Sequence, residues 1–267
     1  MPAPFAVAVR DFPMASFTAH NIRLDDGTLT KPELGFLISE APWFRAARRV
    51  IEISFPGGVA GKRIVDLGCL EGGYTVEFAR MGMQALGIEI RQSNFEACEY
   101  VKSRVQLPNL SFVNDDVWNV AKYGEFDAIF CCGILYHLDK PVEFLKVLSV
   151  LCRRTIIINT HIATETKNEN FPLGELAENE GASGRWLHEY DAASPDLDLE
   201  QYRWTSWSNP KSFWLMKEHI AQTLHECGFN MIFEQFDFVG HNIAREMRSG
   251  HYATHDRRMF VGIKWPQ

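Results

Sequence analysis

Short apolar runs rich in Val, Ile and Leu alternate with amphipathic segments from residue 62 onward. This alternation is typical of a parallel β-sheet whose strands are joined by helices on its faces. Up to residue 159 we predict five strands, at residues 63–67, 85–90, 110–113, 126–132 and 155–159. The sequence therefore predicts one α/β core, with a further part of the sheet supplied by the C-terminal end of the chain.

Local signals place helices between these strands. Gly82 suits the end of a helix, and Pro141 suits the first turn of another. Ser93 or Asn94 is predicted to cap a helix that follows the second strand. The other predicted helices cover residues 31–53, 74–81, 141–151 and 211–227, and the remaining strands cover residues 231–238 and 258–265.

The pattern breaks between residues 164 and 210, where periodicity is lost and aromatic residues are frequent. Connections of this length inside a compact domain are usually lids or binding loops. The segment carries ten acidic and three basic residues, the latter being Lys167, Arg185 and Arg203. We therefore divide the chain into an N-terminal helical cap segment (1–58), a core (59–163), an inserted acidic and aromatic lid (164–210) and a C-terminal part of the core sheet (211–267).

The composition argues against several classes of protein. The formal net charge of -7 gives this chain of 267 residues no overall attraction to nucleic acid or to an anionic membrane. No apolar run approaches the roughly 18 residues that span a bilayer, and no signal peptide is recognisable. The six cysteines lack the paired spacing of a metal site, so we expect no metal and a location in the reducing cytoplasm.

The first predicted strand leads into the sequence VDLGCLEGG, at residues 65–73. The turn after a strand at this position is where open α/β sheets bind ligands. A dinucleotide-binding loop would need glycine at Leu70 and would have no use for the carboxylate of Asp66. An amino-acid-like cofactor with a cationic sulfonium suits these residues better, and S-adenosyl-L-methionine (SAM) is such a molecule.

Two further acids follow the next two predicted strands. Glu89 lies about 20 residues after the glycine turn, a position from which a carboxylate accepts hydrogen bonds from ribose hydroxyls. Asp116 lies just beyond the third strand and can accept from an adenine amino group, while Val117 packs on the ring. Because parallel strands end at one edge of the sheet, Asp66, Glu89 and Asp116 are predicted to surround one cofactor.

Four stretches of the chain, VDLGCLEGG, LGIEI, FVNDDVW and FDAIFCCGILYHLDKP, resemble the Rossmann-like (class I) SAM-dependent methyltransferase family. The likeness covers roughly residues 62–159. It implies an α/β fold with a mostly parallel seven-stranded sheet, helices on both faces and an antiparallel last strand. GILYHL and SFWLMKEHIAQTLHECGF resemble, more distantly, the tRNA wobble-uridine carboxymethyltransferases. One departure is Leu70, where many members carry glycine.

The resemblance also assigns residues to SAM, whose product is S-adenosyl-L-homocysteine (SAH). It implies that the glycine turn holds the methionine portion, Glu89 the ribose, Asp116 and Val117 the adenine, and the end of the fourth strand the face near the sulfonium. The residues predicted to bind the cofactor are Asp66, Gly68, Cys69, Gly72, Glu89, Ile90, Asp116, Val117, Cys132 and Gly133.

Two histidines are candidate catalytic residues. Methyl transfer needs a general base only if the acceptor is a weak, protonated nucleophile. His137 follows the fourth predicted strand and His161 the fifth, so either could serve as that base. The alternative for each is a structural role, because a histidine at the end of a strand or helix also serves as a cap or a hydrogen-bonding residue.

We predict a SAM-dependent methyltransferase that acts on a small molecule rather than on nucleic acid, because the acidic insert would repel a phosphate backbone. The insert is predicted to bind the acceptor, with a contact in a homodimer as the alternative. The alternative functions are a tRNA-modifying methyl or carboxymethyl transferase, an NAD-dependent oxidoreductase and a non-catalytic SAM-binding protein.

A basic cluster near the C-terminus has two interpretations, a solvated loop or a site for an acidic group of the acceptor. Its members are Arg245, Arg248, Arg257 and Arg258, with His241, His251 and His255.

Overall fold

The structure, a computed structural model, describes residues 15–166, 170–194, 197–236, 243–248 and 256–265. The strands of its large sheet are β1 (Arg63–Leu67), β2 (Gln84–Glu89), β3 (Leu110–Asn114), β4 (Phe126–Cys132), β5 (Cys152–His161), β9 (Met231–Gln235) and β10 (Arg257–Ile263). They lie in the order β3-β2-β1-β4-β5-β10-β9. β1 to β5 are parallel, and β10 is antiparallel to both β5 and β9. The predicted fold, including the antiparallel last strand, is confirmed.

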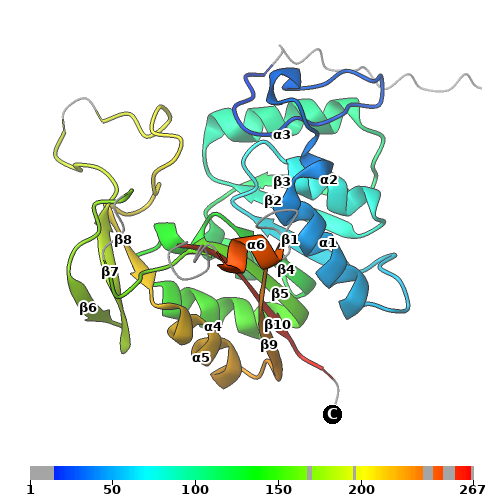
Figure 1. Cartoon of the computed structure of the whole chain (residues 1–267). Helices are drawn as coiled ribbons and strands as arrows, with labels where there is room; N and C mark the ends of the chain where they lie inside the picture. The colour runs from blue at the N-terminus through cyan, green and yellow to red at the C-terminus, as the bar shows by residue number, and fades with distance from the viewer. Residues whose placement is uncertain (1–14, 167–169, 195–196, 237–242, 249–255, 266–267) are drawn as a thin grey trace, which may run out of the picture.

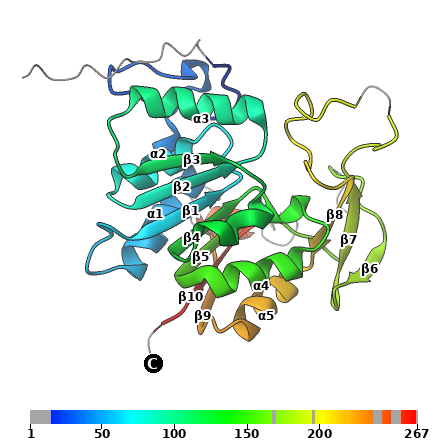
Figure 2. The same ribbon diagram turned by 180° about the vertical axis from the view of Figure 1, so that it is seen from behind.

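Helices cover both faces of this sheet, as Figures 1 and 2 show from opposite sides. One face is covered by α1 (Pro42–Ser54), α2 (Gly73–Arg80) and α3 (Gln92–Arg104), and the other by the 3-10 helix η3 (Val117–Tyr123), α4 (Pro141–Leu151) and α5 (Lys217–Glu226). The short helices are η1 (Pro32–Leu34), η2 (Ile38–Glu40), η4 (Leu135–His137) and α6 (Ile243–Arg248). The sheet is thus the middle layer of three.

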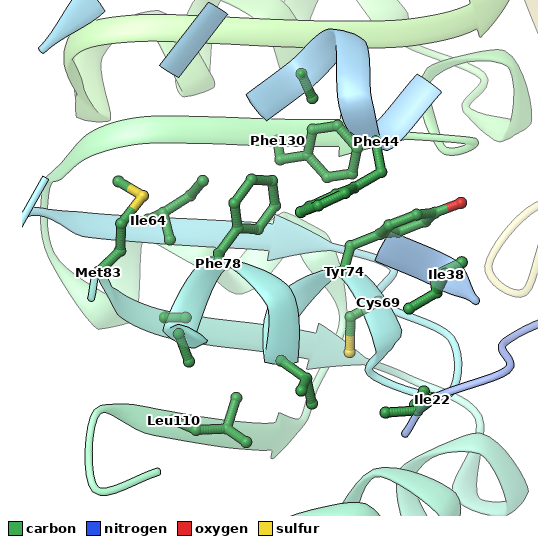
Figure 3. Close-up of a cluster of buried hydrophobic side chains, with 14 of the residues drawn as sticks. Ile22, Ile38, Phe44, Ile64, Cys69, Tyr74, Phe78, Met83, Leu110 and Phe130 are labelled. Carbon is green, nitrogen blue, oxygen red and sulfur yellow. The ribbon is translucent and has the colours of Figure 1, made fainter. Parts of the chain in front are cut away.

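Each face of the sheet buries its own apolar cluster, because successive side chains of a strand point to opposite faces. In β1, Ile64 belongs to the cluster under α1 to α3, whereas Val65 belongs to the cluster under α4 and α5. Figure 3 shows the first cluster, in which the rings of Phe78 and Phe130 lie 5.2 Å apart in an edge-on arrangement. Strands buried on both faces need apolar residues at every position, which explains their nearly continuous apolar runs.

The insert contributes a second, smaller sheet that stands to one side of the large one (Figures 1 and 2). Two of its strands, β6 (Leu176–Asn179) and β7 (Ala182–His188), lie in the insert, and the third, β8 (Lys211–Leu215), directly follows it; all pairings are antiparallel. The predicted helix at 211–227 is therefore wrong in its first residues, and α5 begins only at Lys217. Positions 212–215 are all buried, and a short apolar run without alternation does not distinguish a strand from a helix.

Two predicted helix starts also differ from the structure. The segment 31–53 is divided into η1, η2 and α1, and Pro42 occupies the first turn of α1. α3 begins at Gln92, so neither Ser93 nor Asn94 is its cap. Gly82 and Pro141 have the predicted roles at the end of α2 and the start of α4. In the part of the chain that the structure describes, no helix has the length and apolar character to cross a bilayer.

Candidate active site

A cavity of about 640 Å³ opens at the edge of the large sheet where the parallel strands end. Residues from the ends of β1, β2, β4 and β5 line it together with the lid loop, which we define as residues 197–209 of the insert. Seven of the residues predicted to bind a cofactor line the cavity, namely Gly68, Glu89, Ile90, Asp116, Val117, Cys132 and Gly133. Three others are buried and do not line it, namely Asp66, Cys69 and Gly72.

The turn after β1 is tightly packed. Gly68 has a φ of 63°, and a Cβ at this position would lie 2.0 Å from the Ile134 side chain, so glycine is required there. Leu70 also has a positive φ, 52°, the left-handed conformation that glycine adopts more easily. The backbone at Leu70 thus keeps a conformation suited to the glycine of many family members.

Glu89, at the end of β2, is held in place by this turn. Its Oε2 accepts a hydrogen bond from the Leu70 amide at 2.9 Å, and its Oε1 accepts from the Arg91 amide at 2.9 Å and the Asn94 side chain at 3.4 Å. Burial raises the pKa of this carboxyl above its usual value. Glu89 therefore presents a fixed acceptor to the cavity.

Asp66 lies one layer behind the cavity wall. Its Oδ2 accepts a hydrogen bond from the Thr75 hydroxyl at 2.6 Å, so it links the end of β1 to α2. Burial raises the pKa of Asp66 to about 7, with the Thr75 hydrogen bond opposing the rise and the charge of Glu89 adding to it. Asp66 is thus poised between its two protonation states near neutral pH.

The segment before η1 closes the cavity beside the glycine turn. Glu71 is fully buried and accepts hydrogen bonds from the amides of Ala19 and His20 at 3.1 and 2.8 Å. His20 Nδ1 accepts from the Gly73 amide at 3.0 Å, and burial lowers the pKa of its ring to about 4 against the opposing charge of Glu71. The His20 ring is therefore neutral near pH 7, and both Ala19 and His20 line the cavity.

Arg91 attaches the lid loop to the core from the end of β2. Its guanidinium donates to the carbonyls of Leu199 and Thr205, the latter at 2.7 Å, and lies 5.1 Å from the ring centre of Trp207. Arg91 is 4% exposed, so it also fills space between core and lid. Trp207 and Thr205 in turn line the cavity.

Two more polar contacts hold the lid loop closed. Glu200 accepts hydrogen bonds at the start of α3, from the Gln92 amide at 3.0 Å and the Ser93 hydroxyl at 2.6 Å. Ser208 donates its hydroxyl proton to Asp116 Oδ2 at 2.6 Å. The lid loop therefore covers the cavity and contacts one of the acids predicted to bind the cofactor.

His137 and Glu189 form a hydrogen-bonded pair at the cavity wall. His137 Nδ1 lies 2.9 Å from Glu189 Oε1, which also accepts from the Ser212 hydroxyl at 2.7 Å. The Glu189 side chain is 2% exposed. If the Glu189 carboxylate accepts this hydrogen bond, Nδ1 carries the ring proton and Nε2 is the nitrogen with a free lone pair. His137 lines the cavity.

His161 has a different environment and does not line the cavity. Its ring stacks on Trp214 at 4.9 Å, and its Nδ1 lies 3.2 Å from Asp256 Oδ2. Its Nε2 lies 3.4 Å from a terminal nitrogen of Arg257, which does line the cavity. His161 is thus placed to support Arg257.

The basic cluster near the C-terminus is divided by the fold. Arg257 faces the cavity, whereas Arg258 pairs with Glu234 at 3.1 Å on the other side of β10. Arg245 and Arg248 are exposed on α6. The histidines of the cluster, His241, His251 and His255, lie outside the described residues. So do Lys167 and positions 237 and 238 of the predicted strand.

Sequence reasoning missed several residues of this site. Arg91 follows Glu89 by two positions, and this closeness to a predicted site residue was the available signal. Glu189 and His20 lie in segments without periodicity or motif, and only the folded chain brings them to the ends of the parallel strands.

A family profile described as a methyltransferase domain matches residues 64–154. This part of the chain is therefore similar to a methyltransferase domain. The match extends from β1 through α4 into the start of β5, and therefore covers the ends of β1, β2 and β4 at the cavity.

The names of the curated relatives refer to two kinds of acceptor, a small molecule and a tRNA. The ubiquinone biosynthesis O-methyltransferase of Acinetobacter baylyi is 26% identical over 116 residues, 43% of this chain and 47% of that protein. The tRNA U34 carboxymethyltransferase of Campylobacter hominis is 33% identical over 90 residues, 33% of this chain and 31% of that protein. The chain thus spans less than half the length of these curated relatives.

Solved structures extend the likeness to most of the chain. The N-terminal domain of EvdMO1 with SAH bound has a TM-score of 0.60 and 26% identity, covering 84% of this chain and 82% of that one. Magnesium protoporphyrin IX methyltransferase from Synechocystis PCC 6803 with bound SAM has a TM-score of 0.51 and 14% identity, covering 84% and 80%. The second likeness concerns the fold alone.

Proposed function

We propose that this protein transfers a methyl group from SAM to a small-molecule acceptor in the cavity between the large sheet and the lid loop. The observation that carries the proposal is the position of Glu89, Asp116 and the Gly68 turn around one cavity at the edge of a methyltransferase domain. The SAH bound to the EvdMO1 domain supports the same choice of cofactor.

The cavity wall fits an adenosyl cofactor. Glu89 offers a fixed carboxylate for ribose hydroxyls, and Asp116 with Val117 offers an acceptor and an apolar surface for adenine. Gly68 leaves the backbone bare for close approach of the methionine portion, beside Cys132 and Gly133. Asp66, Cys69 and Gly72 are proposed to act from behind, by shaping the turn rather than by lining the cavity.

The residues of the chain supply acid–base chemistry and exclude water. Bound SAM supplies an electrophilic methyl group on a sulfonium. His137 Nε2 is proposed to take the proton from an acceptor hydroxyl, while Glu189 holds the ring and stabilises the positive charge that it gains. The lid loop, attached through Arg91, keeps solvent away from the cavity. His161, which does not line the cavity, is proposed to be a positioning residue rather than the base.

A small acceptor is favoured over tRNA. The insert carries ten acidic against three basic residues, and Glu200 and Glu189 of that insert lie close to the cavity. Such a surface would repel a phosphate backbone. The tRNA alternative keeps support from the Campylobacter hominis relative, and a tRNA that competes with a small acceptor would favour it.

Three further features belong to this proposal. We place the end of the insert after β8, because β8 pairs with β7 of the insert. The six cysteines are free thiols, which supports a reducing cytoplasm as the location. A homodimer is the alternative use of the exposed aromatic residues of the insert, among them Trp204 and Tyr202.

Calorimetric titration with SAM, SAH and NAD tests the cofactor. We expect SAM and SAH to bind and NAD to show no binding, and we expect Glu89→Ala to weaken SAH binding about tenfold or more, because it removes the cavity's fixed carboxylate. Glu96→Ala, on the exposed side of α3, is the matched control and should leave SAH affinity unchanged. Binding of NAD without SAM would contradict the proposal.

The proposed catalytic pair, His137 and Glu189, is tested by measuring turnover at saturating SAM once an acceptor has been found. His137→Ala is expected to lower kcat by about 10²-fold or more, and Glu189→Gln by less, since it keeps a hydrogen-bond acceptor for the ring. SAH affinity should be unchanged in both. Equal kcat in His137→Ala and the unaltered protein would remove His137 from the mechanism.

A further inference from the structure

The two ends of the cavity differ in how their charged groups are paired. The ends of β2 and β3 contribute the carboxylates Glu89 and Asp116, both engaged in hydrogen bonds, and Arg91 and Arg203 also line the cavity. The opposite end, at β4, β5 and β10, contributes no carboxylate to the cavity lining among the described residues, and instead presents Arg257 with the uncharged Asn159 and Tyr136. Carboxylates and guanidinium groups therefore both line the rest of the cavity, whereas Arg257 is the charged group that the described residues place at the β4, β5 and β10 end.

Arg257 is held by groups that leave its charge unbalanced. Its Nε donates to Asn159 Oδ1 at 2.6 Å, a terminal nitrogen lies 3.4 Å from His161 Nε2, and its guanidinium lies 5.6 Å from the ring centre of Tyr136. None of these partners carries a negative charge. Within the described ranges, no carboxylate forms an ion pair with Arg257, whereas its neighbour Arg258 pairs with Glu234.

A partly buried guanidinium without a counter-ion is costly, and an anionic ligand would offset that cost. The asparagine, the histidine and the tyrosine fix the guanidinium in one orientation, which suits a bidentate hydrogen bond to a planar acidic group. Tyr136 also adjoins the catalytic pair, because its ring centre lies 4.2 Å from that of His137.

The geometry points to a carboxylate-binding subsite at Arg257, so that the methyl acceptor is a small organic acid held by this end of the cavity. The inference rests on the proposed function and deepens it by naming the chemical class of the acceptor. Arg257 and Tyr136 bind the acid, and the remainder of the acceptor extends toward His137 and the aromatic side chains of the lid loop. His161 and Asn159 position Arg257.

The cofactor is a second source of a carboxylate for Arg257, because the amino-acid end of SAM also carries one. The two sources make opposite predictions for cofactor binding. If the acceptor supplies the acid, removal of Arg257 leaves SAH affinity unchanged. If the cofactor supplies it, removal of Arg257 weakens SAH but leaves 5′-methylthioadenosine, which lacks the amino-acid portion, unaffected.

The experiment uses the full chain saturated with SAH and three pairs of probes that differ mainly in charge, namely acetate and acetamide, benzoate and benzamide, and 4-hydroxybenzoate and 4-hydroxybenzamide. Calorimetry and thermal shift measure their binding. We expect at least one acid to bind about tenfold or more tightly than its amide, as hydrogen bonds between charged groups predict. If no acid binds more tightly than its amide, the inference is overturned.

Substitutions then show which residue is responsible for the preference for the acid over its amide. Arg257→Gln is expected to abolish the preference for the acid, Arg257→Lys to retain part of it, and Tyr136→Phe to reduce it. Arg248→Gln, an exposed arginine of α6 from the same basic cluster, is the matched control and should change nothing. Unchanged SAH affinity in Arg257→Gln also shows that this variant folds.

The outcomes separate this inference from the proposed function. Weaker SAH binding in Arg257→Gln with unchanged 5′-methylthioadenosine binding overturns the acceptor subsite and assigns the arginine to the cofactor. An acid preference that survives in Arg257→Gln places the anion elsewhere and overturns it too. In both cases the SAM assignment stands, because it depends on the binding of SAH to the unaltered protein.

Discussion

The strands of the large sheet and the lid loop are stabilised by different forces. In the sheet, Ile129 and Phe130 are fully buried on opposite faces, and parallel ladders satisfy the backbone. The lid loop contacts the core through hydrogen bonds, from Arg91 to its carbonyls and between Ser208 and Asp116. Hydrogen bonds with water can replace such contacts at small net cost, whereas apolar burial cannot be replaced in this way.

This difference indicates which part of the molecule can move. Opening the lid loop exchanges a few polar contacts, so it is compatible with a folded core. Opening any strand of the sheet would expose apolar clusters and amount to unfolding. Changes in the core should therefore act on stability, and changes at the lid contacts should act on ligand binding.

The largest expected effect is on the core. Phe130→Ala removes a fully buried ring that packs on Phe78 and Tyr74 at 5.2 and 5.4 Å. We expect the free energy of unfolding to fall by about 3–5 kcal/mol, as for other buried aromatic truncations. Urea unfolding followed by circular dichroism measures the change. A loss below about 1 kcal/mol would contradict the separation of core from lid.

The next effect is the dependence of core stability on pH through Asp66. Its pKa is raised to about 7 in the folded protein, so the folded state binds more protons than the unfolded state above about pH 4. Stability contributed by this group is complete below its unfolded pKa and is lost as pH rises through about 7. Asp66→Asn should therefore lose less stability between about pH 4 and 8 than the unaltered protein.

Asp115 supplies a control of opposite sign for this measurement. Hydrogen bonds from Tyr123 and Asn119 outweigh the effect of burial and lower the pKa of Asp115 to about 2. Its contribution is present above its unfolded pKa and is lost as pH falls toward about 2. Asp115→Asn should therefore leave the loss between about pH 4 and 8 unchanged. If Asp66→Asn and the unaltered protein have the same pH profile, the role given to Asp66 is wrong.

A third change detaches the lid loop while leaving the core intact. Arg91→Ala removes the hydrogen bonds to Leu199 and Thr205 and the contact with Trp207. We expect SAH affinity to fall about tenfold and limited proteolysis within residues 197–209 to become faster, because the lid is open more of the time. Arg48→Ala, an exposed arginine of α1 paired with Glu52, is the control. Equal proteolysis rates for Arg91→Ala and the control would show that Arg91 does not hold the lid.

The smallest effect is expected at a single lid hydrogen bond. Ser208→Ala removes the 2.6 Å contact with Asp116 and leaves the other lid contacts in place. We expect a change in SAH affinity of a fewfold, in keeping with about 1 kcal/mol for one exposed hydrogen bond. The direction of the change in SAH affinity is informative, since tighter binding would mean that Ser208 competes with the ligand for Asp116. No measurable change would leave Ser208 without a part in holding the lid closed.

The helix after β2 illustrates where sequence reasoning failed. Ser93 and Asn94 are good capping residues, and local rules placed the helix start there. In the folded chain the first amide is bound by Glu200, more than a hundred residues away, and α3 begins earlier at Gln92. A distant carboxylate that replaces a local cap leaves no trace in the local sequence.

The sequence alone determined the parallel sheet, the glycine turn and the acids at the ends of β2 and β3. These features follow from local chemistry, since buried strands need continuous apolar runs and a tight turn needs Gly68. Only the tertiary structure paired His137 with Glu189, moved Asp66 behind the cavity wall and separated Arg257 from its neighbours in the basic cluster. Long-range contacts of a non-periodic insert depend on where the chain folds back, and no spacing in the sequence encodes that position.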